Sequence, residues 1–181
     1  MELIKNFKEN SLVKNLFLAI LATLLLAVSS KIKIPFWPVP MTMQTFVVML
    51  IGILFGWKLG LFTVSLYLIE GIVGLPVFAG TPEKGMGIVY FTGPTMGYLL
   101  GFLITVYLTG FFKFDNNFLK NFVKLCFAVS FIYSFGLLWL GSLIGWDKPI
   151  FELGAQPFLL AELFKVLILT ILIPKILRFR I

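Results

Sequence analysis

The stretch PFLLAELFKVLILTILIPKIL, residues 157–177, is apolar nearly throughout and long enough to cross a lipid bilayer as one helix. It nevertheless carries Glu162 and Lys165 in its interior. A charged side chain at the centre of a spanning helix costs roughly 2.5–3.5 kcal/mol on insertion scales, so two of them need compensation. At about 1.5 Å rise per residue, both side chains lie in the first half of the span. A spacing of three puts them on one face of the helix, where they can pair and together face a cavity.

Two interpretations of this pair are open. In the first, Glu162 and Lys165 form a structural ion pair that only fixes the helix in a bundle. In the second, they are the polar anchors of a ligand site, because ionisable residues inside a membrane segment usually mark a functional site. We prefer the ligand site.

Composition places the whole chain in the membrane. The 181 residues are 60% hydrophobic and 13% charged, whereas charged residues make up about a quarter of an ordinary soluble domain. The formal charge of +7 does not indicate nucleic-acid binding, because the basic residues cluster at the ends of hydrophobic runs, as membrane topology requires. With no histidine and the single cysteine Cys126, we expect no disulfide, no metal site and no cofactor.

We expect an all-α fold: one membrane domain, residues 1–181, with six transmembrane helices. The expected spans are 16–30, 41–55, 61–73, 93–112, 125–144 and 157–177, and the expected external loops are 31–40, 74–92 and 145–156. Lys and Arg in alternate loops divide ten against four, which puts both termini in the cytoplasm and makes the chain a multi-pass plasma-membrane protein.

The external loops and helix ends hold further candidates for a binding pocket. The loop 31–40, KIKIPFWPVP, has three prolines that prevent a helix and an aromatic pair, Phe36 and Trp37. The loop 74–92 is apolar and rich in glycine, and we expect an ordered, partly buried lid. The other candidates from these loops and the neighbouring helices are Thr42, Gln44, Phe78 and Tyr98. For Gln44 a helix-capping or interhelical role is equally open, and for Glu70, a third charge in the membrane, no role is predicted.

A stripe of small residues runs along the first helix. Ala19, Thr23 and Ala27 recur every fourth residue, and such a stripe lets another backbone approach closely. That backbone belongs either to the chain's own bundle or to another subunit.

The sequence lacks the motifs of several enzyme classes. It contains no G-x-x-x-x-G-K-[ST], no H-E-x-x-H and no G-x-S-x-G, so a P-loop nucleotide site and the corresponding protease or esterase chemistry are not expected. The polar residues suit recognition better than catalysis.

Four segments together resemble a known family. They are PVPMTMQT at 38–45, GLPVFAG at 74–80, GPTMGYLLGF at 93–102 and PFLLAELFK at 157–165. In this order and spacing, the chain resembles the biotin-specific substrate-binding (S) component, the BioY family, of energy-coupling-factor (ECF) transporters. The resemblance implies a prokaryotic protein with six membrane helices that captures biotin from outside with high affinity, without catalysis. It also implies a partner module made of a transmembrane coupling protein and two ATP-binding-cassette ATPases, with Ala19, Thr23 and Ala27 as the docking face.

The chemistry of biotin suits the charge pair. Biotin has a ureido group with two N–H donors and one carbonyl, and a tail that ends in a carboxylate. Glu162, where the family usually has aspartate, can accept from the ureido group, and Lys165 can donate to the carbonyl or to the tail. The aromatic residues Phe36, Trp37, Phe78 and Tyr98 are then expected to form walls and lids. Two alternatives remain: capture of another small vitamin, and a membrane enzyme that uses Glu70 or Glu162 as a general acid or base.

Overall fold

The computed structural model describes residues 11–34, 37–83 and 85–180 as a bundle of helices with one short hairpin. The helices are α2 (Ser11–Lys31), α3 (Gln44–Ile72), α4 (Met96–Phe111), α5 (Phe118–Ile144), α6 (Ile150–Gly154) and α7 (Gln156–Ile176), with 3-10 turns η1 (Gly87–Thr92) and η2 (Leu177–Phe179). The strands β1 (Lys33–Ile34) and β2 (Met41–Thr42) pair antiparallel, with Lys33 opposite Thr42.

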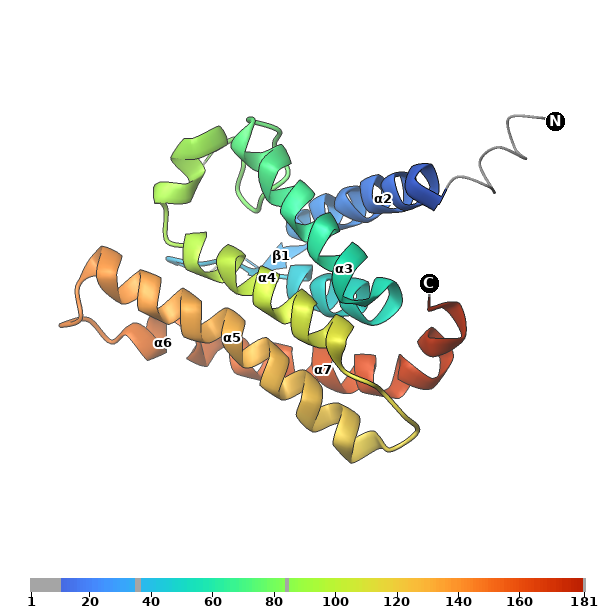
Figure 1. Ribbon diagram of the computed structural model, residues 1–181. Coiled ribbons are helices and arrows are strands. Elements are labelled where there is room, and N and C mark those ends of the chain that lie inside the picture. The colour runs from blue at the N-terminus through green and yellow to red at the C-terminus, as the bar shows by residue number, and fades with distance from the viewer. Residues whose placement is uncertain (1–10, 35–36, 84, 181) are drawn as a thin grey trace.

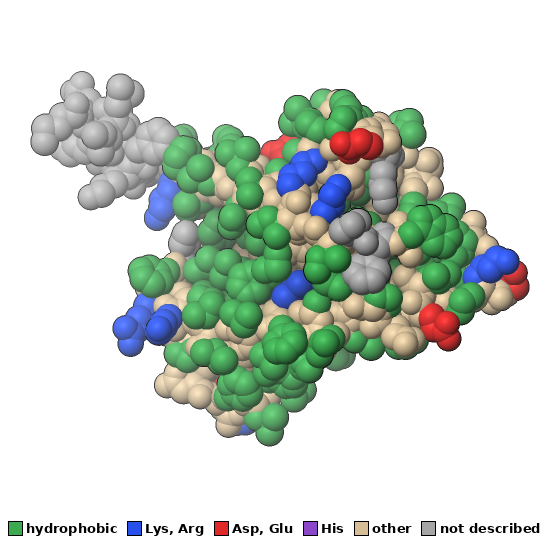
Figure 2. Space-filling model, turned by 180° about the vertical axis from the view of Figure 1, so that it is seen from behind, with side chains coloured by type: hydrophobic (Ala, Val, Ile, Leu, Met, Phe, Trp, Pro, Cys, Tyr) green, Lys and Arg blue, Asp and Glu red, His purple; other side chains and the backbone are tan. Residues whose placement is uncertain are grey.

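Within the described ranges, four helices are long and apolar enough to cross a membrane: α2, α3, α5, and α7 extended through η2. The helix α4 is apolar but shorter. Figure 2 shows hydrophobic side chains across much of one face of the molecule, with most charged side chains near its periphery. Large apolar side chains exposed in this way need a lipid environment. The prediction of an all-helical membrane protein is therefore confirmed at this level, while the number of six spans stays a prediction.

The helix α3 covers most of both expected spans, 41–55 and 61–73, because it turns back on itself. The backbone leaves the helical conformation at Gly56, where φ is 71° and ψ is 175°. A Cβ added to Gly60 would lie 3.5 Å from Cα of Gly52, although two residues eight apart in a straight helix are separated by about 12 Å. Glycine at 56 allows this turn because it adopts a positive φ without a steric penalty.

Close helix crossings use the glycines that repeat every four residues. Gly97 and Gly101 of α4 lie directly on α5, where a Cβ would collide with the carbonyl of Phe135 or with the backbone at Ile132. At the other side of α4, a Cβ on Gly52 would collide with Thr109. These contacts align α3, α4 and α5 side by side, as Figure 1 shows.

The helix α5 begins at Phe118, seven residues before the expected span of 125–144. Asn117 caps it by accepting a hydrogen bond from the backbone N–H of Lys120 at 2.9 Å. Hydropathy locates the apolar part of a helix, whereas the cap decides where the helix starts, so the two boundaries differ.

The loops gather at the two ends of the bundle. In Figure 1 the β1–β2 hairpin, the segment with η1 and the α5–α6 connection lie at one end. The start of α2, the α4–α5 connection and the C-terminal end of the described chain lie toward the other. The first end therefore brings together the segments that the sequence analysis placed outside the cell.

Candidate substrate-binding site

A cavity opens between β2, the start of α3, and the helices α4, α5 and α7. About 540 Å³ of space free of protein atoms, part of it open to solvent, lies between its lining residues. These are Val39, Pro40, Met41, Thr42, Gln44, Thr45, Ala79, Tyr90, Thr95, Tyr98, Leu99, Phe102, Ile132, Tyr133, Phe158, Glu162 and Lys165. A mainly apolar wall with a few polar groups is typical of small-molecule sites.

The two charged residues of α7 face this cavity together. Glu162 is 4% exposed and Lys165 is 7% exposed, and Lys165 Nζ lies 3.3 Å from Glu162 Oε2. Their spacing of three on one helix produces this geometry, as predicted from the sequence. Because the opposite charges are paired, the cavity wall carries two ionised groups without a net charge.

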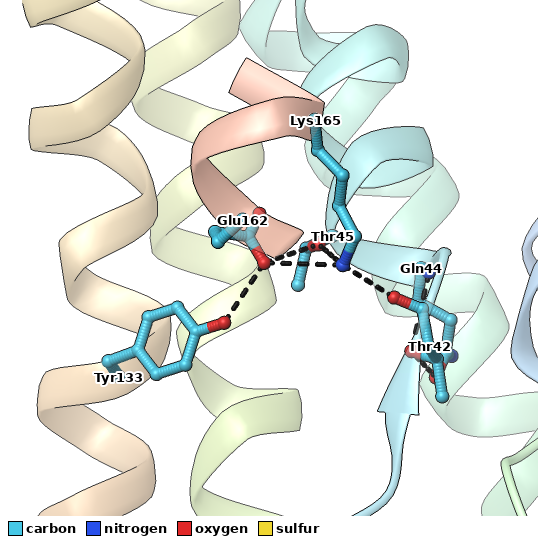
Figure 3. Close-up of polar contacts among 6 residues, drawn as sticks. All are labelled: Thr42, Gln44, Thr45, Tyr133, Glu162 and Lys165. Carbon is cyan, nitrogen blue, oxygen red and sulfur yellow. Dashed lines mark hydrogen bonds and ion pairs between the residues drawn. The ribbon is translucent and has the colours of Figure 1, made fainter. Parts of the chain in front are cut away.

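The two oxygens of the Glu162 carboxylate have different surroundings. Oε2 accepts hydrogen bonds from Thr45 Oγ1 at 3.0 Å, Tyr133 Oη at 2.9 Å and Lys165 Nζ at 3.3 Å (Figure 3). Oε1 is buried and has no hydrogen-bond partner in the described part of the protein. A buried acceptor without a partner costs free energy, on the order of 1–3 kcal/mol or more for a charged group. Oε1 is thus the atom of this ion pair at which a hydrogen-bond donor is missing.

The ammonium group of Lys165 is already fully used. It donates to the backbone carbonyl of Thr42 at 2.6 Å, to Thr45 Oγ1 at 3.0 Å and to Glu162 Oε2. A lysine ammonium has three N–H donors, so each proton has an acceptor. A ligand can receive a hydrogen bond from Lys165 only by replacing or sharing one of these acceptors.

Thr42 and Gln44 also reach the cavity, but in ways that the sequence did not show. Thr42 offers its carbonyl to Lys165, while its hydroxyl bonds to the backbone N–H and side-chain oxygen of Gln44, both at 3.3 Å. Gln44 Nε2 donates to Tyr67 Oη at 2.6 Å, and Tyr67 donates to the carbonyl of Val77 at 2.8 Å. Gln44 therefore links the cavity wall to the loop 74–92 through Tyr67, and a ligand contact by Gln44 stays a prediction.

Tyr98 lines the cavity with its ring, not its hydroxyl. The hydroxyl donates to the carbonyl of Gly154 at 2.8 Å, so its proton is used within the protein. The ring lies against Gly136, where a Cβ would overlap it. Tyr98 is thus a wall residue, as expected.

Phe78, in contrast, is not part of the cavity wall. It is 1% exposed and packs inside the loop, stacked on Tyr90 and at right angles to Tyr67 and Phe91. Its neighbour Ala79 faces the cavity instead. The ring of Phe78 is buried among Tyr67, Tyr90 and Phe91, and this apolar contact stabilises the loop.

Of the aromatic pair in the first external loop, the structure describes only Trp37. The side chain of Trp37 is 77% exposed and does not line the cavity, and Phe36 lies outside the described residues. Val39 and Pro40 contribute the wall from this loop. Trp37 has the exposure typical of a residue at a membrane interface, which the sequence analysis treated as compatible with a covering role.

Thr45, Tyr133, Tyr90 and Phe158 are cavity residues that the sequence reasoning missed. Tyr133 carried a usable signal, because a tyrosine hydroxyl inside an apolar helix needs a hydrogen-bond partner. Tyr90, in η1, donates to the carbonyl of Ala79 at 2.7 Å, and burial raises the pKa of its phenol. It therefore stays a hydrogen-bond donor at neutral pH.

The stripe of small residues on α2 lies against the chain's own bundle. Ala19 is fully buried and Thr23 is 1% exposed, while Ala27 is half-buried. The Thr23 hydroxyl lies 2.9 Å from both the Ile20 carbonyl and Glu70 Oε1. In this conformation Ala19 and Thr23 offer no free surface for another subunit, which favours the bundle-packing alternative. Glu70 thereby gains a local partner.

No group of three or more His, Cys, Asp or Glu side chains suited to a metal ion occurs in the part of the chain that the structure describes. The polar groups at the cavity are hydroxyls, an amide and one ion pair. This set suits an organic ligand with both donors and acceptors.

Comparison with known proteins agrees with this geometry. The chain matches the BioY family over residues 4–180. The probable biotin transporter BioY of Pyrococcus horikoshii is 37% identical over 158 residues, which cover 87% of this chain and 89% of that protein. The biotin transporter BioY of Thermotoga maritima is 32% identical over 157 residues, covering 86% and 91%.

A solved structure is similar in fold as well. The crystal structure of the S-component for biotin from an ECF-type ABC transporter matches with a TM-score of 0.76 and 25% sequence identity, over 92% of each chain. The resemblance indicated by the four sequence segments is confirmed.

Proposed function

The chain belongs to the BioY family, and from this premise we propose that it is the subunit that captures biotin for import by an ECF-type vitamin transporter. As a member of a transporter family it is not an enzyme, and biotin is its cargo, not its cofactor. The observation that carries the proposal is the buried Glu162–Lys165 pair at an apolar cavity, with one carboxylate oxygen unpaired.

The unpaired oxygen supports one orientation of biotin. Glu162 Oε1 can only accept a hydrogen bond, and at neutral pH the carboxylate tail of biotin has no proton to donate. The ureido N–H groups therefore bind Glu162, and a charge-assisted bond of this kind is roughly twice as strong as a neutral one. The ureido carbonyl then competes with Thr42 or Thr45 for a proton of Lys165. The apolar ring and chain lie along residues such as Leu99, Phe102 and Phe158.

The setting of the site is part of the proposal. We infer six membrane-spanning segments, counting the two halves of α3 separately, with both termini in the cytoplasm of a prokaryotic cell. Support comes from the excess of Lys and Arg in alternate loops and from the loops that gather at the cavity end of the bundle (Figure 1). Biotin enters from the outer side between the segments 32–43 and 74–92.

The proposed partner is a module of a transmembrane coupling protein and two ATP-binding-cassette ATPases. Support comes from the similar structure, which is an S-component of an ECF-type ABC transporter. This sequence has no P-loop motif of its own, so uptake driven by ATP through a P-loop would use the ATPases of such a partner.

Binding of radiolabelled biotin to the purified chain in detergent tests the proposal. Glu162→Gln and Lys165→Met each remove one charge of the pair, and truncating one partner of a buried charge pair costs about 2–5 kcal/mol, so we expect binding at least about 30-fold weaker. The matched controls are Glu152→Gln and Lys148→Met, which change exposed residues outside the cavity and should leave affinity unchanged.

Two results would contradict the proposal. Undiminished binding in both Glu162→Gln and Lys165→Met would show that the ligand site lies elsewhere. Absence of biotin binding by the wild-type chain, with binding of another vitamin in a competition panel, would reassign the cargo.

A further inference from the structure

Tyr133 approaches Glu162 from a different helix than the other donors. It lies on α5, and its hydroxyl donates to Glu162 Oε2 on α7 at 2.9 Å, which joins the two helices across the cavity wall (Figure 3). Thr45 and Lys165 reach the same oxygen from α3 and α7. Glu162 Oε2 is thus held from three helices, and Tyr133 is its contact to α5.

The position of the Tyr133 ring is fixed by its neighbours. Tyr98 meets it edge-on, with ring centroids 6.3 Å apart and an interplanar angle of 89°. Phe158 lies on its other side, with centroids 6.5 Å apart and 26° between the planes. Tyr98 is itself anchored by its hydroxyl on the carbonyl of Gly154 and by its ring against Gly136. The hydroxyl of Tyr133 therefore has a defined place before any ligand binds.

This arrangement decides which oxygen of Glu162 remains free. With three donors on Oε2, the carboxylate gains nothing by rotating, and Oε1 stays without a partner. Without the Tyr133 hydroxyl, only the donors on the Lys165 side remain, and the carboxylate can turn so that both oxygens share Lys165 and Thr45. Oε1 would then be occupied before the ligand arrives.

We propose that Tyr133 is a positioning residue, which acts through Glu162 and keeps Oε1 aimed at the N–H donors of the ligand. This inference rests on the proposed function, because it assigns the ligand to Glu162. Tyr133 thereby favours ligands that bring an N–H donor to this point over ligands that bring only acceptors.

The phenylalanine variant isolates the hydroxyl. Tyr133 also lines a second hollow between α5 and α7, which it shares with Glu162 and apolar residues such as Leu137 and Leu159. Removing the ring of Tyr133 would merge the second hollow with the cavity or let both collapse, and biotin affinity would then change for reasons other than the lost hydrogen bond. Tyr133→Phe keeps the ring and its two aromatic contacts and removes only the hydrogen bond.

A double-mutant cycle measures the coupling between Tyr133 and Glu162. Biotin affinity is determined for the wild type, Tyr133→Phe, Glu162→Gln and the double variant. Because the Tyr133 hydroxyl donates to a charged group that contacts the ligand, we expect about tenfold or greater weakening from Tyr133→Phe in the wild-type background. In the Glu162→Gln background the same change should weaken binding less than about twofold, because the carboxylate is already gone.

Tyr107→Phe is the matched control. Tyr107 lies on α4, where its ring packs against Trp57 of α3 and Phe111 of α4. It does not line the cavity, so removing its hydroxyl should not change biotin affinity in either background. Where Tyr133→Phe does not fold, as judged by thermal unfolding, Tyr133→Met replaces it in the cycle, because methionine also lacks the hydroxyl and still fills apolar space. The fold-changes then expected in the two backgrounds are those given for Tyr133→Phe.

The outcomes separate this inference from the proposed function. A wild-type chain that binds no biotin overturns the function and the inference with it. Weak binding by Glu162→Gln together with unchanged binding by Tyr133→Phe overturns the inference alone. An equal loss from Tyr133→Phe in both backgrounds also overturns it, because the hydroxyl would then act independently of Glu162.

Discussion

Glu162 and Lys165 can be buried in a membrane protein because neighbouring polar groups replace much of their hydration. Lys165 has three acceptors, and Glu162 Oε2 has three donors. Desolvating two charges still costs more than their mutual attraction usually returns, so such a pair is poor evidence for stability by itself. The unpaired Oε1 adds to that cost. An arrangement with a bound donor is more favourable than the empty one, which is a physical reason for the site to bind.

Removing the lysine alone should destabilise the protein more than removing both charges. Lys165→Met leaves the carboxylate of Glu162 buried without a counter-charge, and we expect a loss of about 3–5 kcal/mol in the free energy of unfolding. The double variant Lys165→Met/Glu162→Gln should recover most of it. Thermal or denaturant unfolding in detergent measures both. Equal destabilisation in the single and double variants would contradict this account.

At the scale of elements, the end of α2 is tied to the loop that borders the cavity. Lys31 Nζ donates to the carbonyl of Phe78 at 2.9 Å, and to the carbonyl and hydroxyl of Thr81, both at 3.1 Å. Ser30 donates to the carbonyl of Val77 at 2.8 Å. The same loop segment places Ala79 in the cavity wall, so the contacts of α2 and the cavity wall share one stretch of backbone.

Lys31→Met should loosen this stretch. The backbone of 77–83 loses charge-assisted hydrogen bonds, so we expect faster hydrogen–deuterium exchange there and a several-fold faster release of bound biotin. Lys33→Met is the control, because Lys33 is exposed on β1. Exchange in 77–83 that stays as slow as in the wild type would show that the aromatic cluster around Phe78 holds the loop without Lys31.

At the scale of the whole molecule, the two ends of the bundle differ in charge and in function. Lys58, Lys113, Lys175 and Arg178 belong to the segments that gather with the C-terminal end of the described chain, away from the cavity mouth (Figure 1). An excess of Lys and Arg marks the cytoplasmic side of a membrane protein. With the orientation proposed above, the cavity faces outward, which capture from the exterior requires.

Cysteine labelling in intact cells tests this topology. In a Cys126→Ser background, Trp37→Cys and Lys148→Cys should react with a membrane-impermeant maleimide, because both positions are exposed at the cavity end. Lys58→Cys and Arg178→Cys should react only after the cells are permeabilised. The reverse pattern would invert the proposed orientation.

The sequence by itself determined the properties that depend on local pattern. Hydropathy identified a helical membrane protein, and the spacing of Glu162 and Lys165 put both on one face of α7. The sequence also placed small residues at every fourth position of the first helix, and Ala19 and Thr23 are buried against the bundle. Four short segments, taken in their order and spacing, were enough for the family resemblance.

Only the tertiary structure decided which side chains meet. Thr45 and Tyr133 reach Glu162 from positions 117 and 29 residues away, and no periodicity within one helix reports such a meeting. Phe78 turned into an aromatic cluster and Thr23 toward Glu70 for the same reason. Helix spacing specifies the face on which a side chain lies, whereas its partner depends on how the helices cross. The way the helices cross depends on side-chain packing between all of them, which no single segment of the sequence specifies.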